Sequence, residues 1–365
     1  MKKIFILILV FLVVISACKN KNSDPAERFD RAKMLENYAQ NLIKPAFQDL
    51  QSQVNILQAA TNNFVQNTDL QNLQSLQTAW ENAYLSWQYA SAYNFGPAGE
   101  QGLRKGLIEE IGTFPVSETK IEDAIAGGNA NFNDFNRDAR GFLAVEYLIF
   151  NLNEDNAAIL ANFASTNRKN FLLGAVSNLK TRIDEVVAAW NASYLNEFIS
   201  NAGTDAGSST SQLYNEFVKS FESIKNFKLG LPLGKRPGQT QAEPTRIEAY
   251  YSGKTLKMIR EHLQAVENIW YGKDKNGNDG IGFKEYLGSV EGGTNLIVST
   301  ENQWLAVREA LNAIAPSPRI STQIISTPTA LDKLHNELQK HTRFFKSDMS
   351  SLLGIAITFS SGDGD

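Results

Sequence analysis

Apolar side chains recur every three or four residues along most of this chain, which is the spacing of one face of an α-helix. The first stripe consists of Leu35, Tyr38, Leu42, Ala46, Leu50, Val54 and Leu57, and the second of Leu73, Leu76, Trp80, Tyr84, Trp87 and Ser91. Pro45 predicts a kink in the first helix, and Gly96-Pro97 predicts that the second helix has ended.

The same spacing continues through the rest of the chain. Leu172, Val176, Leu179, Ile183, Val186 and Trp190 alternate steps of four and three residues, as in the helices of a bundle. Further helices are predicted near residues 134–152, 212–226, 245–271, 301–315 and 328–353, and the glycine-rich stretch 96–137 predicts loops with short helical pieces. The sequence has no extended alternating pattern, so the predicted fold class is all-α.

Residues 201–211 (NAGTDAGSSTS) form the strongest low-complexity break in the chain. We therefore predict two joined helical bundles, residues 27–203 and 212–365, connected by a linker at 204–211. A crevice between domains is a usual place for a ligand to bind. The predicted architecture thus offers a candidate site between the bundles.

The first residues of the chain differ from the helical pattern. Lys2 and Lys3 precede an uninterrupted apolar run from Ile4 to Ile15. That run is too short to span a bilayer, which needs about 20 apolar residues, and it is typical of a signal peptide. We predict that residues 1–17 are this signal peptide.

The small residues before Cys18 resemble the lipobox of bacterial lipoproteins, so Cys18 is the predicted lipid-attachment residue and residues 18–26 a tether. An ordinary signal peptide with a chance cysteine is the alternative. Lys19 follows the cysteine, and this pattern resembles a signal for outer-membrane sorting. We therefore predict a cell-envelope protein, anchored to the outer membrane by its lipid and facing the periplasm.

Composition excludes some functions. Without Lys2 and Lys3, 33 basic residues face 39 acidic ones, a net charge of −6, which argues against a nucleic-acid partner. Cys18 is the only cysteine, so the chain has neither an internal disulfide nor a thiolate metal cluster. The sequence has no histidine pair with the spacing that chelates zinc from one helix; its histidines are His262, His335 and His341.

His341 lies on an apolar stripe and is predicted to be a packing residue.

The candidate with most chemical interest is Glu146, because its helical neighbours three and four residues away are Phe142, Leu143, Ile149 and Phe150. Burying an unpaired carboxylate costs several kcal/mol. The fold must therefore supply a cation, a metal or hydrogen-bond donors, or Glu146 takes up a proton. A buried ion pair, a ligand or metal site, and a surface position created by local distortion all remain open.

Five segments occur in an informative order: Trp80 to Asn94-Phe-Gly-Pro97, Gly141 to Glu146, Glu248 to Ser252, Trp270 to Gly272, and Leu353-Gly354 with Asp363 to Asp365. They resemble, in turn, the tryptophan-rich helix, the GxHxxE segment, the ExxxS helix start, the tyrosine-glycine helix end and the terminal segment of the imelysin family. Members of that family are iron-regulated proteins related to a component of periplasmic iron uptake. The resemblance implies an imelysin-like all-α fold.

The chain departs from this family at charged positions. Leu143 stands where GxHxxE has histidine, Tyr84 where many members have arginine, and Ser91 where many have glutamate. The resemblance leaves Glu146, Glu248 and Ser252 as predicted ligand-binding residues. Glu146 and Glu248 are the predicted metal ligands if the cofactor is iron or another divalent metal, although two carboxylates alone make a poor transition-metal site.

Three functions follow from this resemblance. The first is a non-enzymatic envelope lipoprotein that binds a ligand or metal and acts in iron acquisition, with the membrane and iron-uptake or other envelope proteins as partners. The second is a metallopeptidase, which family history implies, although catalytic zinc normally has three protein ligands. The third is a scaffold lipoprotein with a vestigial site, in which a lysine or arginine would pair with Glu146.

Overall fold

The computed structural model describes residues 29–100 and 106–360. The predicted signal peptide, the tether with Cys18, and Asp363 to Asp365 lie outside these ranges. Every regular element within them is a helix, so the predicted all-α fold class is confirmed. No helix in these two ranges combines the length and apolar character needed to cross a bilayer.

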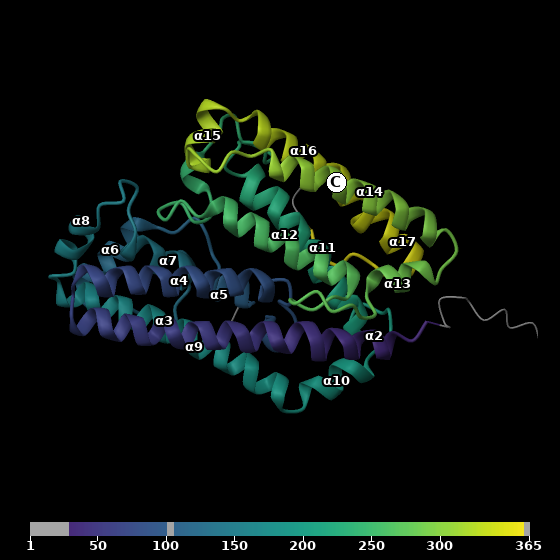
Figure 1. Cartoon of the computed structure of the whole chain (residues 1–365). Coiled ribbons are helices and arrows are strands. Elements are labelled where there is room, and N and C mark those ends of the chain that lie inside the picture. The colour runs from purple at the N-terminus through teal and green to yellow at the C-terminus, as the bar shows by residue number, and fades with distance from the viewer. Residues whose placement is uncertain (1–28, 101–105, 361–365) are drawn as a thin grey trace, which may run out of the picture.

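Three long helices dominate the first half of the chain: α3 (Lys44–Gln66), α4 (Leu70–Ala90) and α9 (Thr166–Asn191), and α3 lies beside the other two (Figure 1). Before α3, the chain runs through α2 (Arg31–Asn37) and the π-helix η3 (Tyr38–Ile43). Pro45 lies in the first turn of α3, directly after this π-helix. The predicted irregularity near the proline is therefore a change of helix type.

The shorter elements of this half are η4 (Gly96–Ala98), α5 (Leu107–Ile111), α6 (Glu118–Gly127), η5 (Arg137–Ala139), α7 (Gly141–Ile149), α8 (Asn156–Asn162) and α10 (Tyr194–Ser200). Of these, η4, α5 and α6 confirm the predicted short helical pieces between residues 96 and 137. The helix predicted near 134–152 is too long, because α7 begins only at Gly141. That glycine has a φ of +80°, and a Cβ there would lie 2.5 Å from the Ile111 carbonyl oxygen.

The second half contains α11 (Ser209–Ser223), η6 (Ile224–Gly230), η7 (Pro244–Arg246), α12 (Thr255–Tyr271), α13 (Phe283–Gly288), α14 (Gly293–Asn312), α15 (Ile320–Ser326), α16 (Thr329–Arg343), η8 (Phe344–Met349) and α17 (Ser350–Leu353). The helix predicted over 245–271 is wrong in its first third, since α12 begins at Thr255. The Ser208 hydroxyl caps α11, so the helix begins at Ser209 and includes the last three residues of the predicted linker 204–211.

Buried apolar side chains connect the two halves. One continuous cluster runs from Met34 to Ile355, and α4 packs against α12 across the halves. The Tyr38 hydroxyl in η3 donates to the Ile269 carbonyl oxygen in α12 at 2.6 Å. The helical groups drawn in purple to teal and in green to yellow thus share a core (Figure 1).

Candidate functional site

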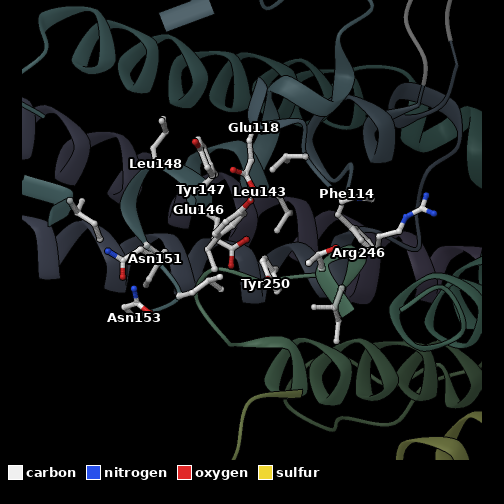
Figure 2. A pocket seen from close by; sticks show the side chains of 18 of the residues that line it. Phe114, Glu118, Leu143, Glu146, Tyr147, Leu148, Asn151, Asn153, Arg246 and Tyr250 are labelled. Atoms are coloured by element: carbon white, nitrogen blue, oxygen red, sulfur yellow. Dashed lines mark hydrogen bonds between the residues drawn. The ribbon is translucent and has the colours of Figure 1, made fainter. Parts of the chain in front are cut away.

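An open cavity of about 610 Å³ lies between α7, the segment around Phe114 to Glu118, and the chain that precedes α12. Figure 2 shows Glu146, Leu143, Tyr147 and Tyr250 in the middle of its lining. Asn151 and Asn153 lie on one side of them, and Phe114 and Arg246 on the other. The volume is within the range of small-molecule sites in proteins, about 300 to 1,000 Å³.

The apolar helix α7 holds Glu146 at this cavity. Its residues from Gly141 to Glu146 are all buried, and the Trp80 indole nitrogen of α4 donates to the Phe142 carbonyl oxygen at 2.8 Å. This bond uses a carbonyl group near the start of α7 to attach the helix to its neighbour. Glu146 is only 1% exposed, so the alternative of a surface position is excluded.

Glu146 has hydrogen-bond donors but no cationic partner. The Ser252 backbone amide donates to Oε1 at 2.8 Å. No lysine, arginine or histidine nitrogen of the described residues lies within 4.0 Å of its carboxyl oxygens. Burial raises the pKa of Glu146 to about 7 and is partly opposed by the Ser252 hydrogen bonds. The ion pair that the scaffold hypothesis requires is therefore not formed.

Glu248 is equally buried but has the opposite environment. Lys228 Nζ of η6 lies 2.9 Å from its Oε2, and the Tyr84 hydroxyl donates to its Oε1 at 2.6 Å. Lys228 also donates to Gln88 Oε1 at 2.5 Å. Burial lowers the pKa of Lys228, and the charge of Glu248 opposes that change. The Glu248 carboxylate is thus neutralised within the protein.

The stretch Glu248 to Ser252 is a turn and not the predicted helix start. Ala249 has a φ of +54°, which is rare for a residue with a Cβ. The Thr255 hydroxyl donates to the Glu248 carbonyl oxygen at 2.6 Å, and the Ser252 amide is used by Glu146. These tertiary contacts replace the local hydrogen bonds of a helix.

The predicted metal pair does not fit iron or another transition metal. Both Glu248 oxygens already face a lysine and a tyrosine. No group of three or more histidine, cysteine, aspartate or glutamate side chains in the part of the chain that the structure covers could hold a metal ion. Glu146 alone offers too few ligands. The structure brings Glu146 and Ser252 together, and it directs Glu248 to other partners.

Sequence reasoning missed Lys228 and Gln88, and it noted Tyr84 only as a departure from the family. Lys228 follows Phe221 and Ile224 by seven and four residues, so it falls on an apolar helical stripe. A charge on such a stripe is the same signal that singled out Glu146. His341 confirms its predicted packing role, because it is fully buried against Trp304 and Phe345.

These features define an all-helical protein with a ligand-sized cavity between its halves and a buried acid at the cavity floor. The chain matches the Imelysin family over residues 43–343, and it belongs to that family. Iron-regulated protein A of Synechococcus elongatus is 22% identical over 323 residues, which cover 84% of each chain.

Two solved structures show the same fold. An iron-regulated protein A precursor from Parabacteroides distasonis has a TM-score of 0.71 and 14% identity, over 91% of this chain and 97% of its own. An imelysin-like protein from Psychrobacter arcticum has a TM-score of 0.71 and 18% identity, over 92% and 98%. The imelysin-like fold that the sequence predicted is therefore confirmed.

Proposed function

We propose that this chain is a non-enzymatic, lipid-anchored protein of the cell envelope that binds a small-molecule ligand in the Glu146 cavity and acts in iron acquisition. The anchoring rests on Cys18 and the apolar run before it. The link to iron rests on the relatives named iron-regulated protein A. In this proposal, the partners are the membrane and envelope proteins of an iron-uptake system.

The observation that carries the ligand-binding part is the position of Glu146. A carboxyl group that is 1% exposed borders an open cavity of about 610 Å³ without a basic side chain beside it. Packing alone would favour an apolar residue here, because a buried acid without a counterion costs free energy. A ligand that contacts the acid would recover part of this cost.

The lining gives less support to a peptidase. No histidine lines the cavity, and Glu248 is held by Lys228 and Tyr84. A hydrolytic site needs a positioned nucleophile or metal-bound water in addition to one acid. Glu146 with the Ser252 amide can bind and orient a group, and this arrangement supports recognition without chemistry.

A cavity-blocking variant tests the ligand-binding proposal. We would measure the thermal unfolding of the full chain with a panel of ferric and ferrous iron, zinc, organic amines, organic acids and neutral saccharides. At least one class should raise the melting temperature of the wild type, because ligands that bind only the folded state stabilise it. Val116→Trp, which places a large ring in the cavity lining, should abolish the rise.

Val298→Trp is the matched control, because Val298 is 54% exposed on α14, far from the cavity lining in sequence. It should respond to the ligand as the wild type does. If no class stabilises the wild type, or if Val116→Trp responds equally, the binding proposal is wrong. Chelator-sensitive cleavage of an unfolded protein substrate, lost in Glu146→Gln, would favour the peptidase instead.

A further inference from the structure

Three tyrosines form a continuous aromatic wall in the cavity. Tyr147, Tyr250 and Tyr251 contact one another edge to face, with ring centroids 5.2 Å apart in each of the two adjacent pairs. All three residues line the same cavity as Glu146. Figure 2 shows Tyr147 and Tyr250 on either side of the Glu146 side chain. The acid and this aromatic wall therefore face the same space.

Two hydroxyl groups of the aromatic wall are already bonded. The Tyr251 hydroxyl donates to Glu118 Oε1 at 2.5 Å, and the Tyr147 hydroxyl donates to Glu122 Oε1 at 2.7 Å. These bonds fix the orientation of two rings that line the cavity. A tyrosine ring attracts cations at its face.

The basic side chains near the cavity are already matched by acids. Arg168 makes two bonds to Glu122, at 2.9 and 3.0 Å. Arg246 lies 3.2 Å from Glu243, which is the second such pair.

Arg319, whose positive charge lowers the pKa of Glu146, lies 2.8 Å from Glu154 and also donates to the Tyr251 carbonyl oxygen. Glu146 and Glu118 have no such counterion among the described residues. When Glu146 is ionised, the cavity therefore has a negative excess, because Glu146 and Glu118 both belong to its lining.

We infer that the ligand of this cavity is a small organic cation whose ammonium group contacts Glu146 and the tyrosine faces. The inference rests on the proposed function and names its ligand class. A metal ion would need more ligands than this lining concentrates at one point. An organic ammonium needs only a carboxylate and aromatic faces, and the amides of Asn151 and Asn153 beside them suit the polar remainder of such a molecule.

Matched pairs of probes test the charge requirement. Isothermal titration calorimetry on the full chain would compare cadaverine with its diol analogue pentanediol, and choline with its uncharged carbon isostere dimethylbutanol. At least one cation should bind about tenfold or more tightly than its neutral analogue, because the desolvated carboxylate and rings favour positive charge. Glu146→Gln should remove that preference.

Glu337→Gln on α16 is the control, since this acid lies outside the cavity lining and should leave the preference unchanged. Tyr250→Leu is a second test if Glu146→Gln folds poorly. It should lower the affinity for the cation more than the affinity for the neutral analogue. Equal binding of cation and analogue, or a preference that survives both variants, would overturn the inference. So would a panel in which only acids, saccharides or metal ions stabilise the protein, although the binding proposal would then stand.

Discussion

Glu146 and Glu248 are two buried glutamates with different roles, and their neighbours explain the difference. Glu248 faces Lys228 and Tyr84, so its charge is balanced by the protein. Glu146 faces the Ser252 amide and a cavity. The same side chain is thus a structural partner in one place and a recognition group in the other.

The raised pKa of Glu146 predicts how stability changes with pH. Its pKa is about 7 in the folded chain against 4.5 in the unfolded one, so the folded chain binds its proton more tightly. The resulting stabilisation is present below pH 4.5 and is lost as pH rises through about 7. Its size is about 3 kcal/mol in the free energy of unfolding.

Glu146→Gln isolates this effect, because glutamine can still accept from the Ser252 amide but does not ionise. Urea unfolding of both proteins should give similar free energies near about pH 4 and a more stable variant near about pH 8. Glu248, Arg319 and Tyr84 are other charged or ionisable groups near Glu146, and all three are present in both proteins. A difference between the proteins that does not change with pH would contradict the prediction.

Residue-level prediction succeeded where the signal was local. The burial of Glu146 follows from four apolar neighbours on its own helix. The partners of Glu248 cannot be predicted from its sequence neighbours. Tyr84 is 164 residues away, and Lys228 lies on a separate helix. Which acid is paired depends on how helices meet, and the sequence pattern does not contain that information.

At the level of elements, long amphipathic helices were predicted best. The stripe from Leu172 to Trp190 lies within α9, and the stripe from Leu73 to Trp87 lies within α4. The turn before α12 could not be predicted, because its conformation depends on Glu146 accepting the Ser252 amide and on Thr255 bonding to Glu248. Tertiary hydrogen bonds overrode local helix propensity there.

A second prediction at this scale concerns the π-helix η6, which places Lys228 beside Gln88 of α4 and Glu248 of the turn before α12. Lys228→Met leaves the Glu248 carboxylate buried with only the Tyr84 hydroxyl beside it. Removing one member of a buried ion pair costs about 3 to 5 kcal/mol. Chemical denaturation should therefore show a loss of stability of this size.

Combining Lys228→Met with Glu248→Gln removes both charges and should restore most of the lost stability. The four free energies of this double-mutant cycle give the coupling between the two side chains. Additive effects, with the double variant less stable than either single one, would show that the pair does not stabilise the junction. Lys257→Met is a control nearer the surface, because the Lys257 side chain is 49% exposed in its ion pair with Glu81.

At the level of the whole molecule, the two predicted bundles share one core, and the cavity opens where α7 of the first half meets the turn of the second. The prediction of a site between two helical groups was therefore useful. The predicted metal ligands Glu146 and Glu248 do not share one open site, because Lys228 pairs with Glu248. The remaining acid borders space large enough for a ligand.

Both ligand-binding proposals depend on Glu146 being a buried acid without a counterion. A carbon-13 NMR pH titration of its side-chain carboxyl group, assigned by the signal lost in Glu146→Gln, measures this directly. The structure predicts a midpoint of about 7 for the ligand-free protein. A midpoint at or below the ordinary value of 4.5 would mean that a cation or full solvation stabilises the ionised group, and it would contradict the account.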